Sequence, residues 1–92
     1  MTKADIVNKI AKNTGLEKTA VQAVIEGFME TVIESVSKDE NVYLRGFGSF
    51  IVKHRAEKTA RDITKKTTIV IPAHDIPAFK PADSFIEKVM NK

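Results

Sequence analysis

A chain of 92 residues with no cysteine and a formal net charge of +3 excludes disulfide scaffolds and the common cysteine-zinc folds. So short a chain buries only a small core, and without disulfides we expect self-association to complete it. The charged N-terminus is unlike a signal peptide, and no apolar run approaches the roughly 20 residues that cross a bilayer. We therefore expect a single-domain cytoplasmic protein.

The first predicted element is a helix over residues 3–13. Thr2 and Asp5 form a capping-box pattern at its start, and Asp5 also suits the positive end of the helix dipole. Gly15 is the residue expected in the left-handed conformation just past the helix end.

A longer helix is predicted over residues 18–37. Its apolar residues cover more than one face, which indicates burial on more than one side. They are Val21, Val24, Ile25, Phe28, Met29, Val32, Ile33 and Val36. One face can meet the first helix, and the other needs a partner that this short chain can hardly provide. Glu26, Glu30 and Glu34 mark the solvent side. Because they would repel phosphate, we expect that side to face away from nucleic acid.

Two helices joined at Gly15 also suggest a helix-turn-helix motif, whose second helix enters a major groove. A recognition helix needs Arg, Lys, Asn or Gln on its outer face. This one carries mainly glutamates there, with Lys18 and Gln22 near its start. We therefore set this alternative aside.

A short strand is predicted after a polar turn at residues 38–41, because the apolar residues Val42 and Leu44 alternate with their neighbours as in a strand. The run RGFGSF at residues 45–50 then forms a tight Gly-X-Gly turn, and a second strand follows through residues 50–54. Paired glycines leave backbone N–H groups uncovered, which is a common way to meet a phosphate oxygen. A structural hairpin is the plainer interpretation of the same turn.

The basic residues gather in residues 53–66. This run, KHRAEKTARDITKK, has six Lys or Arg against two acids, so it carries +4 while the rest of the chain sums to −1. Such a segment attracts a polyanion, most commonly nucleic acid; a solvated charged loop is the alternative. The sequence TTIVI at residues 67–71 favours a returning strand. With the reversal at residues 62–66, the arm would be about 33 Å long.

The chain closes with a proline-rich stretch and a helix at about residues 82–91. Three prolines in ten residues forbid central-strand pairing but permit extended or edge structure. The inner face of the helix would be formed by Phe85, Ile86, Val89 and Met90. The helix starts either with Pro81 as its first residue or with Ser84 and Glu87 as a capping box.

Few residues are candidates for catalytic or metal chemistry. His54 and His74 could stand near each other across the base of the hairpin, where a metal pair is conceivable and two neutral surface histidines are the plainer interpretation. The sequence has no nucleophile–base pair, carboxylate dyad or P-loop. We expect neither an enzyme nor a cofactor.

The chain resembles the HU/IHF family of bacterial histone-like, nucleoid-associated DNA-binding proteins. The resemblance is carried by GFGSF at residues 46–50, the basic arm, IPA at residues 71–73 and PAFKP at residues 77–81. It covers essentially all 92 residues in the same order of elements.

The resemblance implies an α+β fold in an intertwined dimer. A two-helix hairpin would form a dimerisation body over about residues 1–40. A three-stranded antiparallel sheet with a protruding β-ribbon arm would occupy about residues 41–78, the arm itself being about residues 53–73. A short C-terminal helix would follow. The implied function is binding of duplex DNA in the minor groove with low sequence specificity, and its bending.

The resemblance also assigns roles to residues. Along the arm and at its base, the DNA contacts would be Lys53, Arg55, Lys58, Arg61, Lys65 and Lys66. The clamp on flanking DNA would be formed by Lys3, Arg45, Gly46, Gly48, Ser49 and Lys80. The dimer interface would include Val24, Phe28, Val32, Phe47, Phe50 and Phe79.

The sequence departs from the family pattern at the arm tip. Arg61-Asp62-Ile63 stands where Arg-Asn-Pro is common, so Ile63 takes the position of the wedge inserted at a base step. Asp62 brings a negative charge near phosphates, and Lys65-Lys66 stand where Thr-Gly is frequent. Other departures are Glu17 at a helix cap, Ala60 in place of glycine, and Asp83 in place of lysine.

Two alternatives remain open. A protein resembling integration host factor would select DNA sites through shape and deformability. A dimeric interaction protein would instead use the arm to grip an acidic protein or an anionic glycan. The expected partners are duplex DNA and a second copy or a paralogue of the chain, with RNA as a secondary candidate and no membrane.

Overall fold

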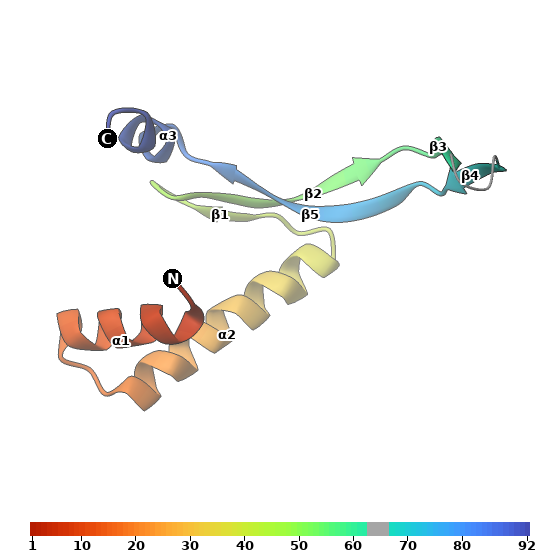
Figure 1. Cartoon of the computed structure of the whole chain (residues 1–92). Helices are drawn as coiled ribbons and strands as arrows, with labels where there is room; N and C mark the ends of the chain where they lie inside the picture. Colours follow the sequence, from red (N-terminus) through yellow and green to blue (C-terminus); the bar gives the residue numbers. More distant parts are fainter. Residues whose placement is uncertain (63–66) are drawn as a thin grey trace. The chain divides into compact units, whose positions relative to one another are not determined.

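The computed structural model describes residues 1–62 and 67–92, with the side chains of residues 61 and 62 excepted. The chain divides into two compact units, Met1–Glu34 and Ser35–Lys92. Helices form the first unit, and an antiparallel sheet with a terminal helix forms the second (Figure 1). The predicted α+β class is confirmed.

The first unit contains α1 (Lys3–Thr14) and most of α2 (Lys18–Ser37). The predicted capping box is confirmed: Thr2 Oγ1 accepts from the Asp5 N–H at 3.3 Å, and the Asp5 carboxylate accepts from the Thr2 N–H at 2.9 Å. These two hydrogen bonds, the backbone one first, lower the pKa of Asp5. Gly15 caps α1 in the left-handed conformation, with φ of 76°.

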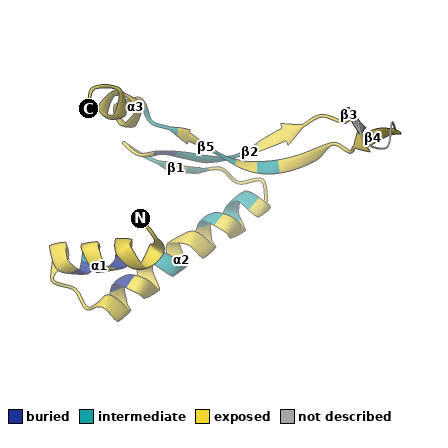
Figure 2. Cartoon of the chain, in the orientation of Figure 1, coloured by how far each residue is buried: buried dark blue, intermediate teal, exposed yellow. Residues whose placement is uncertain are grey.

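The core of the helical unit is small. Val7, Ala11 and Val21 are buried, and Ile10 and Ile25 pack against them. Other large apolar side chains of α2 remain exposed in the single chain; they are Val24, Phe28, Met29 and Ile33 (Figure 2). The exposed fraction reaches 69% at Val24 and 41% at Phe28. Because such a surface is costly in water, the helices need a further apolar partner.

The three-stranded sheet has the order β1-β2-β5, and all neighbours are antiparallel. Its strands are β1 (Val42–Leu44), β2 (Gly48–Arg55) and β5 (His74–Pro81). Beyond β2 and β5 the chain forms a second pair, β3 (Lys58–Asp62) and β4 (Thr67–Ile71), which runs on as a ribbon (Figure 1). The predicted sheet and ribbon arm are confirmed.

The strand pairing is interrupted within the predicted arm of about residues 53–73. Residues 53–55 belong to β2 and pair with β5, and the pairing then stops at residues 56–57 and 72–73. Pro72 lies in this break and has no N–H for a ladder hydrogen bond. The expected reversal at residues 62–66 falls mainly outside the described residues.

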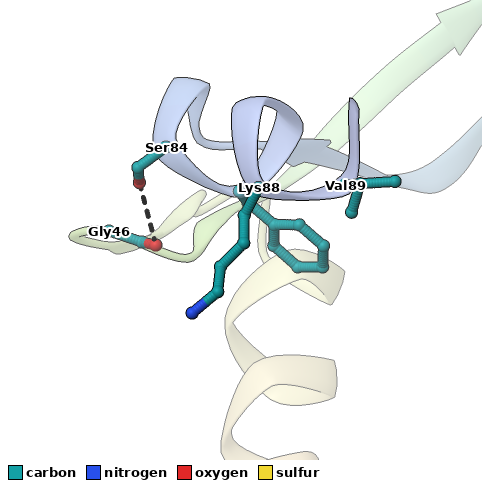
Figure 3. A pocket seen from close by; sticks show the side chains of 5 residues that line it. Gly46, Ser84, Lys88 and Val89 are labelled. Atoms are coloured by element: carbon teal, nitrogen blue, oxygen red, sulfur yellow. Dashed lines mark hydrogen bonds between the residues drawn. The ribbon is translucent and has the colours of Figure 1, made fainter. Parts of the chain in front are cut away.

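The turn between β1 and β2 is tied to α3 (Asp83–Met90). The Ala82 N–H donates to the Phe47 carbonyl at 2.9 Å, and Ser84 Oγ donates to the Gly46 carbonyl at 3.3 Å (Figure 3). Ala82 is the N-cap and makes no side-chain cap hydrogen bond. The predicted start at Pro81 is wrong because Pro81 ends β5, and the predicted Ser84 capping box is wrong because the Ser84 hydroxyl bonds to the turn.

Gly48 is required by close packing. A Cβ atom there would lie 2.6 Å from the Lys80 carbonyl oxygen and 2.6 Å from the Phe79 ring. Gly46 instead adopts φ of 81°, which L-residues rarely occupy. The two glycines of the turn thus serve different needs.

The exposed apolar surface predicts that thermal unfolding depends on protein concentration. If a second copy covers it, a 100-fold rise in concentration stabilises the folded state by about 2.7 kcal/mol. For two chains of this size the apparent Tm should rise by about 7 °C. Circular dichroism melts over that range measure the shift.

Val24→Asp places a charge on this surface and should lower the apparent Tm, whereas the control Thr19→Asp, at an exposed polar site of α2, should change it little. A Tm that is the same at every concentration would mean that one chain folds alone.

Candidate nucleic-acid interface

The sheet presents a basic face. Successive side chains of a strand alternate between faces, so Ser49, Lys53 and Arg55 of β2 point the same way. On β5, Lys80 pairs with Ser49 and His74 with Arg55. The lysines, the arginine and the histidine are all exposed. The fold thus brings four of the predicted DNA-contact residues onto one face of one sheet.

The Gly-X-Gly turn lies at the end of this face. A shallow depression of about 660 Å³ is lined by residues from β1, the turn, β2 and β5, and by Asp83 at the start of α3. The predicted contact residues that line it are Arg45, Gly46, Gly48, Ser49 and Lys80. Gly48 is buried, so its main role here is packing. Its contact with DNA stays a prediction, as do the other four.

The predicted arm residues are described only in part. Lys58 is exposed at the start of β3, opposite Ile71. Arg61 pairs with Thr68 through the backbone. The remaining predicted contacts lie outside the described residues; they are Ile63, Lys65 and Lys66.

The opposite face of the sheet is aromatic. Phe50 and Phe79 are cross-strand partners with ring centroids 5.1 Å apart. Phe47 lies 5.2 Å from Phe79 and 5.6 Å from Phe85. Three of the four phenylalanines predicted for the dimer interface, Phe47, Phe50 and Phe79, thus form one cluster, and Phe85 joins them. The sequence predicted Phe85 on the inner face of its helix but did not indicate its contacts with Phe47 and Phe79.

Below the same helix, Lys88 and Val89 line an open pocket of about 450 Å³ with Gly46, Ser84 and Phe85 (Figure 3). Phe79 and Phe85 remain 39% and 37% exposed. The aromatic cluster is therefore incomplete within one chain.

Lys3 has a partner inside the helical unit. Its Nζ atom lies 2.9 Å from Glu26 Oε1, which also accepts from Gln22 Nε2 at 3.2 Å. The hydrogen bond from Lys3 is the main cause that lowers the pKa of Glu26, followed by the bond from Gln22 and the charge of Lys3. Glu26 therefore holds a lysine and does not simply mark a solvent stripe. A phosphate approaching Lys3 would have to compete with it.

The two histidines have separate partners. His54 Nδ1 pairs with Asp75 Oδ1 across β2 and β5. His74 Nδ1 donates to the Pro72 carbonyl at 2.9 Å, since a carbonyl can only accept. The register places the two rings on opposite faces of the sheet. In the described part of the chain, no three His, Cys, Asp or Glu side chains gather to hold a metal ion.

Among residues 1–62 and 67–92, no helix combines the length and the apolar character that a membrane crossing requires.

Comparisons with known proteins agree with this geometry. The family model described as bacterial DNA-binding protein matches residues 1–90. DNA-binding protein HU of Thermus thermophilus is 39% identical over 89 residues, which cover 97% of this chain and 92% of the relative. Integration host factor subunit beta of Marinobacter nauticus is 34% identical over 90 residues, with coverage of 97% and 92%.

A solved structure gives the same result for the fold. The Anabaena HU chain in a cocrystal with DNA matches with a TM-score of 0.93 and 35% identity, and both chains are covered in full. The likeness includes the sheet, the ribbon and all three helices. The chain belongs to the HU/IHF family of bacterial DNA-binding proteins.

Proposed function

We propose that this protein is an architectural, histone-like DNA-binding protein that binds duplex DNA through the minor groove, with low sequence specificity, and bends it. The observation that carries the proposal is the full-length likeness to an HU chain solved with DNA. Its function is one of binding, not catalysis, and its place is the bacterial nucleoid in the cytoplasm.

The basic face of the sheet supplies affinity without reading sequence. Lys53, Arg55 and Lys80 are exposed cations on a regular surface, and the ribbon adds Lys58, which is exposed at the start of β3. Cations that neutralise phosphates release condensed counterions, which favours binding to any duplex. Arg61, Lys65 and Lys66 would add charge along the arm.

A second copy, or a paralogue, would complete the fold. In the helical unit it would cover Val24, Phe28 and Val32, which a single chain leaves exposed or half-buried. In the sheet unit it would cover the cluster of Phe47, Phe50 and Phe79. A dimer then carries two arms, and two arms can hold one duplex from both sides.

Bending requires a wedge as well as charge. Apolar side chains inserted between base steps kink a duplex, at a cost of a few kcal/mol per step that wrapped contacts offset. In this sequence Ile63 occupies the tip position where the family commonly has proline. Ile63 is apolar and suits the role.

A second candidate is an IHF-like protein that prefers particular sites. The chain is 34% identical to an IHF subunit and 39% identical to an HU protein, and these similar values support this second candidate. Its selectivity would come from DNA shape and deformability. Competition by one defined duplex over random duplex of more than about tenfold would establish it. Equal competition supports the HU-like function.

Affinity should fall steeply with salt. If about 6–10 phosphates are neutralised, the association constant drops roughly 10³–10⁵-fold between about 50 and 200 mM salt. Lys58→Gln should weaken all duplexes alike and lower the salt slope by about one unit. Lys12→Gln, an exposed lysine of α1 outside the basic face, serves as the control. Fluorescence-anisotropy titrations provide both numbers, and a flat salt dependence would refute the electrostatic mechanism.

Ile63→Ala should reduce the bend more than the affinity, because the wedge contributes unstacking rather than charge. End-to-end fluorescence transfer on a duplex measures the bend. Val70→Ala, which shortens an exposed apolar side chain of β4, is the matched control. An unchanged bend in the Ile63 variant would show that another residue is the wedge.

Glu26→Gln should strengthen DNA binding by about 2- to 5-fold at low salt, since it frees the Lys3 ammonium for phosphate. Lys3→Gln should weaken binding, and adding Glu26→Gln to it should then change nothing further. Titrations of the four proteins form a double-mutant cycle. Weaker binding by Glu26→Gln would mean that the ion pair only supports the helices.

A further inference from the structure

We propose that Tyr43 is a DNA-contact residue whose hydroxyl donates a hydrogen bond to a backbone phosphate of the duplex flanking the arms. Tyr43 is absent from the set expected from the sequence. The inference rests on the proposed function and extends it to one neutral side chain on β1.

The register places Tyr43 on the basic face. Tyr43 pairs with Ser49, and Ser49 pairs with Lys80, so the three form one row across the sheet. Tyr43 also lines the shallow depression that contains Arg45 and Lys80. Its side chain is 73% exposed, which is unusual for a large aromatic residue in a strand. A ligand can therefore reach it.

Two hydrogen bonds fix the tyrosine and leave its proton free. β1 begins at Val42, which pairs with Phe50, so no residue of β1 pairs with Val52. The Val52 N–H instead donates to Asn41 Oδ1 at 3.2 Å. Asn41 Nδ2 then donates to the Tyr43 hydroxyl oxygen at 3.3 Å. Because this oxygen accepts from Asn41, the O–H of Tyr43 remains as a donor directed to an outside acceptor.

The charge around Tyr43 selects an anionic acceptor. Arg45 and Lys80 line the same depression, and Asp83 is its acidic member. The two cations outweigh the carboxylate, and a phosphate oxygen accepts O–H hydrogen bonds strongly. Asp83 weakens the attraction between these cations and a phosphate but does not cancel it.

The position on the sheet sets where on the duplex the contact falls. From the row of Tyr43, Ser49 and Lys80 to the row of Arg55 and His74 is six residues along β2. At about 3.3 Å per residue the two rows are about 20 Å apart, which is about six base pairs of duplex at roughly 3.4 Å each. Tyr43 would thus touch flanking DNA and not the segment held by the arms.

Length-dependent affinity tests this placement. Tyr43→Phe removes the hydroxyl alone, so binding to a duplex of about 30 base pairs should weaken about 3- to 10-fold. Binding to a duplex of about 12 base pairs, which ends before the tyrosine, should stay within about 1.5-fold of the unmodified protein. The salt slope should not change, because a neutral hydroxyl releases no counterion. Thr31→Val, which removes a hydroxyl bonded to the Gly27 carbonyl within α2, should have no effect on either duplex.

Chemical protection gives a second readout that needs no variant. Tyr43 is the one tyrosine of the chain, so nitration by tetranitromethane followed by mass spectrometry reports on it alone. The long duplex should slow nitration by at least about 5-fold, and the short duplex should leave the rate unchanged.

The outcomes separate this inference from the proposed function. Suppose that the unmodified protein and Tyr43→Phe bind the long duplex equally well and that the duplex does not slow nitration. The tyrosine contact is then refuted and the proposed function stands. If the unmodified protein binds neither duplex, the tyrosine contact and the proposed function are both refuted.

Discussion

The fold depends on apolar surface that a single chain cannot bury. Among the described residues, Val7, Ala11 and Val21 are the buried apolar side chains, and both units leave large aromatic or branched side chains open to water. Three buried side chains offset little of the entropy of ordering a chain of this length. On the proposed function, a second copy would cover α2 and the phenylalanine cluster and so supply the missing burial. The same association would double the number of arms, which would link stability to DNA binding.

The two-residue period of the strands separates an aromatic face of the sheet from a basic one, which are the faces proposed for dimerisation and for DNA contact. Along β2, Phe50 faces the aromatic cluster, whereas Ser49 and Lys53 on either side of it face the basic surface. A shift of β2 by one residue would exchange its two faces, and both proposed functions would then be lost. The close approach at Gly48 helps to fix that register, because any side chain there would collide with Lys80 and Phe79.

Much of the local structure could be predicted from the sequence because it depends on neighbouring residues. The bounds of α2, the capping box at Thr2 and the left-handed Gly15 all follow from local patterns and are confirmed. Composition and pattern predicted a basic arm and self-association, whereas the family resemblance supplied the intertwined form of the dimer and the grip of the arms on DNA. Contacts between distant residues could not be predicted: Ser84 bonds to Gly46 across 38 positions, and Lys3 pairs with Glu26 across 23. The hydrogen bond from Asn41 to the Tyr43 hydroxyl joins residues only two positions apart, but no sequence pattern indicated it.

The stoichiometry of the DNA complex tests most directly whether a shared apolar interface presents two arms to one duplex. Sedimentation velocity or native mass spectrometry of the complex with a duplex of about 30 base pairs measures it. The account predicts two chains, each of 10.2 kDa, on one duplex, together with dimers in the free protein. A saturated complex of one chain per duplex, formed by a free protein that is monomeric, would contradict it.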